Sequence, residues 1–177
     1  MNLTETLISS EPIERTSFLH INRDKIQLPN GNIHERIVIR HPGAAAILAI
    51  TEDNKVVLVR QWRHAVGCEM LEIPAGKLDA GEAPETCAMR ELGEETPYIA
   101  ERMELIHTFF SAPGFCDEKM YIFRAINIRV GSELNPDEDE FVETELLTKE
   151  DVRQAIKSGK ICDAKTIIAL QTWLSEQ

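Results

Sequence analysis

Glutamates and one arginine are concentrated in a short segment of the chain that can form a single helix. Glu91, Glu94 and Glu95 follow one another closely, and Glu82 and Arg90 precede them. On a helix Glu91 and Glu95 lie one turn apart on the same face, where like charges repel by roughly 0.2–0.5 kcal/mol per pair. On a helix Arg90 lies one turn before Glu94, so of these glutamates only Glu94 has a cationic partner at helical spacing. The cluster therefore requires a positive charge from outside the helix.

A hard divalent cation can supply that charge. Mg2+ prefers carboxylate oxygens, keeps several waters and usually shares its site with the phosphates of a substrate. The alternative is a solvated acidic helix face, which is common in a chain with 30 acidic and 19 basic residues. Solvated faces usually mix lysine with glutamate, whereas this face carries one sign of charge. The charge pattern alone leaves both interpretations open.

The full spacing of the segment is more specific than its charge. Gly76 is followed by five residues, Glu82, seven residues and then Arg-Glu-Leu-x-Glu-Glu at 90–95. This pattern resembles the Nudix box, the signature of hydrolases that cleave nucleoside diphosphates linked to another moiety. The family normally has glycine at position 97, where this chain has proline. Proline pushes Thr96 away from helical geometry, so the helix must end without the usual left-handed glycine.

The resemblance implies roles for the residues of the box. The metal ligands that it implies are Glu91, Glu95, the carbonyl of Ala75 and, as outer or second-metal ligands, Glu94 and Glu82. The implied cofactor is Mg2+, with Mn2+ as a possible substitute. Arg90 would orient a glutamate, as groups behind metal ligands do. A plain i,i+4 salt bridge to Glu94 is the alternative, and both roles are compatible.

A second acidic segment lies further along the chain, where residues 135–141 read Asn-Pro-Asp-Glu-Asp-Glu-Phe. By composition it is an ordinary solvated acidic loop. ADP-ribose pyrophosphatases, the branch that this chain resembles, often carry a glutamate in this loop that activates water or binds a metal. Glu138 and Glu140 match that glutamate, and Glu138 is the first candidate for the general base. The catalytic residues implied by the resemblance are therefore Glu138, Glu140, Arg90 and Glu94.

Residues outside the box indicate the substrate class. Glu-Ile-Pro-Ala-Gly at 72–76, Gln-x-Arg at 61–63 and Ser-Ala-Pro-Gly-Phe-Cys-Asp-Glu at 111–118 are similar to the ADP-ribose pyrophosphatase branch. Pro113 lies fifteen residues after Tyr98, near an offset typical of ADP-ribose specificity. The pair at 115–116 is Phe-Cys, where relatives commonly have small polar residues. The resemblance therefore implies a nucleotide sugar as the substrate.

Several side chains are candidates for binding that substrate. The Arg63 guanidinium can bind two phosphate oxygens at once, although it can equally be a surface arginine at a strand end. Arg36 and Arg40 can reach the cleft of a partner subunit. Phe18 can stack on adenine, although a lone aromatic in a strand is more often part of the core. The substrate-binding candidates are Arg63, Arg36, Arg40, Pro113, Gly114 and Phe18.

The elements that position these residues form two parts. We expect residues 1–42 to be a small β subdomain for dimerisation and substrate contacts, with a tight turn at Asn30-Gly31, and residues 43–177 to be the hydrolase domain. The apolar run at 43–50 predicts a strand buried on both faces. Helices are expected at 84–96, 148–158 and 163–174. Strands flanked by helices predict an α/β fold, and the resemblance makes it a Nudix-type α/β/α sandwich with a mixed β-sheet.

Composition argues against several other classes of protein. The formal net charge of −11 disfavours sequence-independent binding to nucleic acid or to an anionic membrane. No apolar run is long enough for a membrane span or a signal peptide, so we expect a cytoplasmic protein. The 4 cysteines have no C-x-x-C spacing, which favours buried reduced thiols over zinc. Relatives dimerise by exchanging N-terminal strands, which implies a homodimer.

The resulting hypothesis is Mg2+-dependent hydrolysis of ADP-ribose to AMP and ribose 5-phosphate. One alternative is a Nudix hydrolase of another nucleoside diphosphate sugar or a dinucleotide. Another is a non-catalytic Nudix module that senses nucleotides. Such modules usually lose glutamates of the box, and all of them are present here, which favours an enzyme.

Overall fold

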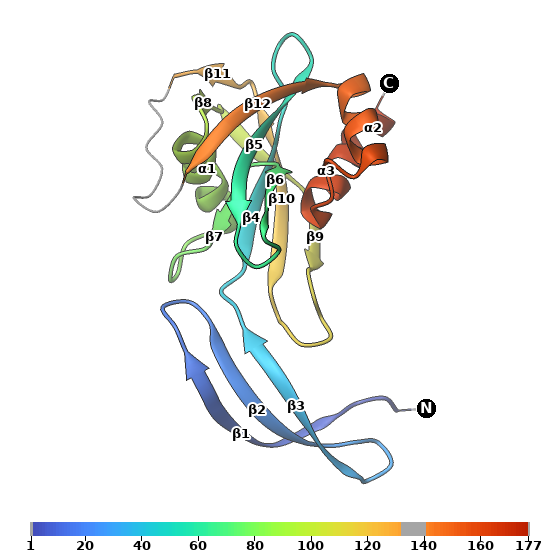
Figure 1. Cartoon of the computed structure of the whole chain (residues 1–177). Helices are drawn as coiled ribbons and strands as arrows, with labels where there is room; N and C mark the ends of the chain where they lie inside the picture. The colour runs from blue at the N-terminus through green and yellow to red at the C-terminus, as the bar shows by residue number, and fades with distance from the viewer. Residues whose placement is uncertain (1, 132–140, 177) are drawn as a thin grey trace. The chain divides into compact units, whose positions relative to one another are not determined.

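The computed structural model describes residues 2–131 and 141–176. The chain forms two compact units (Figure 1). The first consists of Met1–Gly43 and Phe110–Lys119, and the second of Ala44–Phe109 and Met120–Gln177. A division of the chain at residue 42 does not capture the second segment of the first unit.

The first unit is built on an antiparallel sheet with the strand order β1-β2-β3. Its strands are β1 (Thr6–Arg15), β2 (His20–Gln27) and β3 (Ile33–Arg40). The turn predicted at Asn30-Gly31 connects β2 to β3, and Gly31 has a φ of 87°, a conformation that glycine adopts without steric cost. Every side chain of β1 is exposed. This sheet therefore contributes little to a hydrophobic core.

Backbone hydrogen bonds attach residues 110–119 to the first unit. The Ile39 N–H donates to the carbonyl of Phe115 over 2.7 Å, and the Asp117 N–H donates to the carbonyl of Ile39 over 3.1 Å. The Asp117 carboxylate also accepts from the His41 N–H over 2.8 Å and from Arg40 over 3.2 Å. The segment that contains Pro113 and Gly114 is therefore held by the end of β3.

Three sheets lie in the described part of the second unit. The largest is mixed, with the order β7-β4-β10-β9, in which β10 is parallel and β7 antiparallel to β4. Its strands are β4 (Ala44–Ala49), β7 (Ala75–Lys77), β9 (Arg102–Phe110) and β10 (Lys119–Ile126). An antiparallel sheet joins β12 (Val142–Thr148), β5 (Lys55–Arg63) and β6 (Cys68–Glu72), and a small one joins β11 (Arg129–Val130) and β8 (Tyr98–Ile99).

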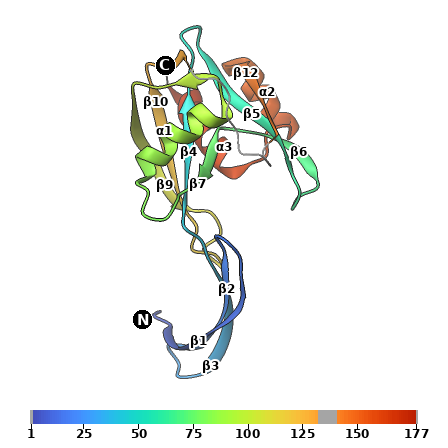
Figure 2. The ribbon, with the colours of Figure 1, turned by 90° about the vertical axis from the view of Figure 1, so that its left-hand side faces the viewer.

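Helices cover the sheets of the second unit on both sides (Figures 1 and 2). One side carries α1 (Pro84–Glu95), and the other carries α2 (Lys149–Ser158) and α3 (Ala164–Ser175). Every residue of β4 is buried, because alternate side chains enter different cores. Leu48 packs in the core with α2 and α3, and Ile47 packs in the core with α1. The predicted α/β/α arrangement with a mixed sheet is confirmed.

Local signals explain where these helices begin and end. Pro84 occupies the first turn of α1, where its missing N–H is harmless. Thr148 and Asp151 form a reciprocal capping box at the start of α2, and Gly159 ends that helix with a φ of 79°. In the described part of the chain, no helix has the length and apolar character that crossing a bilayer requires.

Candidate active site

The helix α1 carries two glutamates on its buried face. Glu91 is 6% exposed and Glu95 is 1% exposed, and they alternate with the apolar residues that pack α1 on the sheet. A buried carboxylate is costly unless it is hydrogen-bonded or paired with a cation. The surroundings of these two carboxylates therefore determine what the site can do.

The C-cap of α1 is Thr96, which precedes Pro97, the residue at the position where the Nudix box normally has glycine. Its backbone is extended, with φ −138° and ψ 158°, as expected for a residue that precedes proline. The Thr96 N–H and hydroxyl both donate to the carbonyl of Leu92, over 3.2 Å and 2.6 Å. This double contact satisfies a carbonyl in the last turn, so α1 ends at Glu95 without a left-handed residue.

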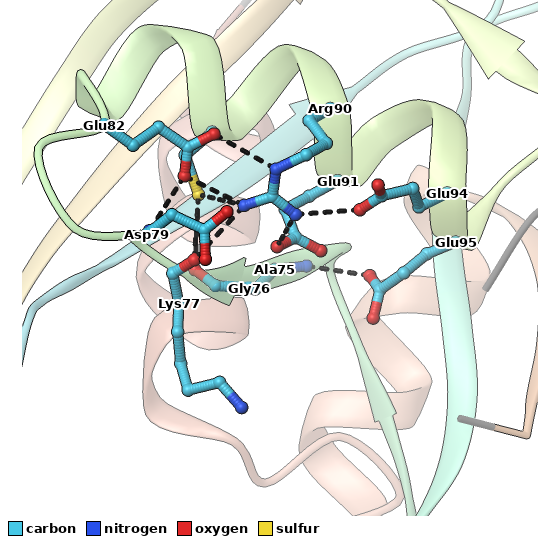
Figure 3. A network of polar contacts seen from close by, with 10 residues as sticks. Ala75, Gly76, Lys77, Asp79, Glu82, Arg90, Glu91, Glu94 and Glu95 are labelled. Atoms are coloured by element: carbon cyan, nitrogen blue, oxygen red, sulfur yellow. Dashed lines mark hydrogen bonds and ion pairs between the residues drawn. The ribbon is translucent and has the colours of Figure 1, made fainter. Parts of the chain in front are cut away.

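Arg90 connects three of the glutamates (Figure 3). Its guanidinium donates to both carboxylate oxygens of Glu82, over 3.0 Å and 2.9 Å. Nη1 donates to Oε1 of Glu91 over 2.7 Å and to Oε2 of Glu94 over 2.8 Å. Hydrogen bonding to Arg90 lowers the pKa of Glu82 to about 2, and hydrogen bonding to Glu82 raises the pKa of Arg90. We call Arg90 and these three glutamates the Arg90 network.

The network corrects the expectation that Arg90 pairs with Glu94 alone. The i,i+3 and i,i+4 rule counts neighbours along the helix surface, but the long arginine side chain also reaches the adjacent Glu91 and the loop that precedes the helix. The Glu82 carboxylate accepts from the Asp79 N–H over 3.0 Å as well, which fixes it beside Arg90. The compensating charge expected from outside the helix is therefore provided in part by the helix itself.

The strand β7 lies against the buried glutamates of α1 (Figure 3). The Ala75 N–H donates to Oε2 of Glu95 over 2.9 Å. The Glu91 carboxylate packs so closely on Gly76 that a Cβ atom at this position would overlap it. Gly76 therefore leaves the space that the Glu91 carboxylate occupies, and its φ is not in the left-handed region. These contacts bring Ala75, Gly76, Glu91 and Glu95 together.

The donors at this site fit a hard divalent ion in chemistry, since carboxylate and carbonyl oxygens are the ligands that Mg2+ prefers. Within residues 2–131 and 141–176, no three His, Cys, Asp or Glu side chains are positioned to enclose a metal ion. In the Arg90 network, Oε1 of Glu91 and Oε2 of Glu94 accept from the guanidinium. The assignment of metal ligands remains a prediction.

Arg63 is the last residue of β5, and its side chain binds a glutamate. Its Nε and Nη2 donate to the two oxygens of Glu72 over 2.7 Å and 2.8 Å. Lys165 of α3 also donates to Glu72, and to Asp163 over 3.0 Å. Burial alone would raise the pKa of Glu72, but its bonds to Arg63 and Lys165 lower it to about 2.

Sequence reasoning missed Glu72 and Lys165. A signal existed for Glu72, because it stands between Leu71 and Ile73 in a mainly apolar segment, and a buried acid in such a segment needs a cation. Lys165 gave no such signal. It lies next to the helix cap Asp163, a position at which a lysine is usually solvated.

The remaining substrate candidates belong to the first unit. Arg36 pairs with Glu5 over 2.8 Å, and Arg40 pairs with Asp24 over 3.1 Å. Phe18 lies in the turn between β1 and β2, where it contacts the His41 ring edge-on with 5.8 Å between ring centroids. Its 38% exposure excludes the core alternative. Pro113 and Gly114 lie in the segment held by β3, and all five stay predictions as substrate contacts.

The predicted bases Glu138 and Glu140 lie outside the described residues. Within the described part of α1, Arg90 and Glu94 contact each other as the sequence predicts. Their catalytic roles stay predictions.

Comparison with known proteins identifies relatives for nearly the whole chain. An ADP-ribose pyrophosphatase of Bacillus subtilis (strain 168) is 41% identical over 171 residues, which are 96% of this chain and 92% of that protein. A methanol dehydrogenase activator of Bacillus methanolicus is 42% identical over 94% of this chain and 91% of that protein. A GDP-mannose pyrophosphatase of Cronobacter sakazakii (strain ATCC BAA-894) is 33% identical over 78% of this chain and 76% of that protein.

A solved structure supports the fold independently of sequence. The crystal structure of an ADP compounds hydrolase superposes with a TM-score of 0.82, covering 98% of this chain and 96% of that chain at 23% identity. The NUDIX domain model matches residues 40–170, which include the Arg90 network and β7. The chain therefore belongs to the Nudix family.

Proposed function

We propose that this protein hydrolyses the diphosphate of ADP-ribose with Mg2+, giving AMP and ribose 5-phosphate. The observation that carries the proposal is the complete set of Nudix-box glutamates, with Glu91 and Glu95 buried beside β7. The choice of ADP-ribose rests on the relative from Bacillus subtilis, which is named for that activity and matches 96% of this chain.

The chain's own residues hold and orient the reacting groups in this mechanism. Glu91, Glu95 and the Ala75 carbonyl would hold Mg2+, which would neutralise diphosphate oxygens and lower the pKa of an attacking water. Arg90 keeps Glu91 and Glu94 in place, and the Ala75 N–H fixes the carboxylate of Glu95. A water oxygen attacks one phosphorus of the diphosphate, and the bond between that phosphorus and the bridging oxygen breaks. A carboxylate accepts the water's proton. Glu138 and Glu140 are the proposed acceptors.

The first unit supports a homodimer. Strands β1 and β3 expose five large aliphatic side chains, each between 47% and 56% exposed: Leu7, Ile8, Ile13, Ile33 and Ile37. Exposed apolar groups at this density are typical of a surface that another protein covers. We propose that a second copy of the chain covers this sheet and that Arg36 and Arg40 serve the partner's site. Light scattering after gel filtration measures the mass directly. The cytoplasmic location stays a prediction.

Product analysis on a substrate panel tests the function. ADP-ribose, GDP-mannose and a diadenosine polyphosphate are each incubated with Mg2+, and the nucleotides and sugar phosphates released from each substrate are quantified by chromatography. We expect ADP-ribose to give the highest kcat/KM. A preference for GDP-mannose would overturn the substrate and keep the hydrolase.

The Glu95→Gln variant separates an enzyme from a nucleotide sensor. We expect kcat to fall by about 100- to 1000-fold, because a neutral amide is a poor ligand for Mg2+. Glu85→Gln is the matched control, since Glu85 is an exposed glutamate in the first turn of the same helix. Tight ADP-ribose binding without turnover by the unmodified protein would indicate a sensing module.

The relative from Bacillus methanolicus favours a second candidate, the activation of a dehydrogenase. That protein is named for an effect on methanol dehydrogenase and is 42% identical over 94% of this chain. Adding this protein to a methanol dehydrogenase assay tests the candidate. The Glu95→Gln variant then distinguishes activation that needs hydrolysis from activation by contact alone.

A further inference from the structure

A cluster of four charged side chains lies beside the proposed site, at the junction of β5, β6 and α3. We call it the Glu72 cluster, and its members are Arg63, Glu72, Asp163 and Lys165. The Glu72 side chain is 2% exposed and the Lys165 side chain is 13% exposed. Three charge-assisted hydrogen bonds converge on the Glu72 carboxylate, two from Arg63 and one from Lys165. One buried carboxylate thus holds two cations.

The second acid of the cluster is already engaged in structure. Asp163 caps α3, since its Oδ2 accepts from the Thr166 N–H over 2.9 Å and from the Thr166 hydroxyl over 2.6 Å. The same hydroxyl accepts from the Ile73 N–H over 2.9 Å. The start of α3 is therefore tied to the segment that leads from Glu72 to Ala75.

Glu72 lies three residues before Ala75, so the chain itself connects this cluster to β7, and Arg63 is bonded to Glu72. Hydrogen bonding to Glu72 raises the pKa of Arg63, and the charge of Glu95 on α1 adds to that effect. The Arg63 side chain is 40% exposed, whereas its partner Glu72 is 2% exposed. Its guanidinium is therefore fixed at one edge by a buried group and reaches the surface elsewhere.

We propose that Lys165 is a positioning residue for substrate binding, which acts through Glu72 on Arg63. Lys165 shares the charge of Glu72, so Arg63 remains oriented by that carboxylate without being fully neutralised by it. With Lys165 present, the Glu72 cluster has two positive and two negative charges, so an anionic diphosphate near Glu95 meets the guanidinium without an excess of negative charge around it. The inference rests on the proposed function, because it takes a diphosphate as the ligand.

Removal of the Lys165 charge has a specific consequence. The Glu72 cluster then carries one net negative charge, and the potential at the diphosphate becomes less positive by the contribution of one unit charge. For a partly screened charge this corresponds to about a five- to tenfold weaker interaction. The loss affects ground state and transition state alike, so KM for ADP-ribose rises while kcat changes little.

Three single variants test the proposal. Lys165→Met and Lys165→Gln remove the positive charge, whereas Lys165→Arg keeps it. Lys160→Met is the matched control, because Lys160 is also a lysine paired with a glutamate, Glu145, over 3.3 Å, but at an exposed position. We expect KM to rise about five- to tenfold in Lys165→Met and Lys165→Gln, and to return within about twofold of the original value in Lys165→Arg.

Two further readouts separate positioning from a purely structural role. Mg2+ affinity without nucleotide, measured by calorimetry, should be the same in Lys165→Met and in the unmodified protein. In an Arg63→Met background, the effect of Lys165→Met on KM should disappear, because the side chain through which Lys165 acts is then absent. An unchanged KM in both neutral variants, an equal rise in Lys160→Met, or a rise that persists without Arg63 would overturn the proposal.

The proposed function is judged separately by the unmodified protein. If that protein does not hydrolyse ADP-ribose, the function fails, and the dissociation constant for ADP-ribose replaces KM in the same comparison. The inference then fails if Lys165→Met and Lys165→Gln bind ADP-ribose as tightly as the unmodified protein.

Discussion

Replacement of Arg90 by methionine should destabilise the protein in a way that Mg2+ partly reverses. Methionine keeps much of the length of the side chain and removes its charge and all its hydrogen bonds. Three carboxylates, those of Glu82, Glu91 and Glu94, then lose their shared cation. Their mutual repulsion is left uncompensated in the folded state and is relieved on unfolding.

The magnitude follows from how deeply these groups are buried. Breaking a buried ion pair by removing one partner costs about 3–5 kcal/mol, whereas an exposed pair contributes roughly 0.2–1 kcal/mol. The Arg90 side chain is 30% exposed, and those of Glu91 and Glu94 are 8% and 32% exposed. We therefore expect a loss of about 2–3 kcal/mol, which lowers the Tm by about 4–12 °C in a chain of this size.

Added Mg2+ should restore more stability to the variant than to the unmodified protein. Loss of the guanidinium leaves the carboxylates with a larger net negative charge, so a cation that binds the folded state binds it more tightly. An affinity gain of about tenfold corresponds to about 1.4 kcal/mol of additional stabilisation at saturation.

Scanning calorimetry in EDTA and in saturating Mg2+ measures both effects. Arg60→Met is the matched control, because Arg60 also contacts three glutamates, Glu69, Glu143 and Glu145, but on the surface of another sheet. We expect this control to lose at most about 1 kcal/mol and to respond to Mg2+ as the unmodified protein does. An unchanged Tm for Arg90→Met in EDTA, or an equal Mg2+ response in both proteins, would refute the reasoning.

Three further predictions concern the same region. Gly76→Ala should lower kcat/KM for ADP-ribose by at least about tenfold in steady-state assays, because the new Cβ displaces the carboxylate of Glu91. Stability should fall as the pH drops from about 4.5 toward 2 in acid-unfolding experiments. The pKa values of Glu72 and Glu82 are depressed in the folded protein, so their stabilising contribution is present above the pKa of the unfolded state and is lost on protonation. Gly93→Ala should raise the stability in urea by up to about 1 kcal/mol without loss of activity, since a Cβ there meets no atom within 4 Å.

The fold was predictable where one physical signal dominated. The apolar run that became β4 has no polar position, and only burial on both faces accommodates such a strand. Pro84 and the capping box at Thr148 marked the starts of α1 and α2. The attachment of residues 110–119 to the first unit was not predictable, because it depends on backbone hydrogen bonds to Ile39 that carry no side-chain signature.

The candidate site was predictable in its residues and less so in its contacts. Spacing placed Glu91 and Glu95 on one face of a helix, and the structure buries both. Spacing gave no account of the bond from Glu95 to the Ala75 N–H, or of the overlap that requires Gly76, because both depend on how β7 packs against α1. Contacts between distant segments follow from the assembled fold.

The Arg90 network also bears on how strongly the proposed metal must bind. Where no other cation compensates the negative charge of the metal ligands, the metal provides folding free energy and its removal unfolds the domain. Here a guanidinium already pairs with Glu82, Glu91 and Glu94, so α1 can pack on the sheet before any cation arrives. The fold then places no lower limit on the affinity for Mg2+, which can be weak enough for the ion to enter together with the diphosphate that helps to bind it. Removal of Arg90 shifts this balance, since it makes the cation a larger part of what stabilises the helix.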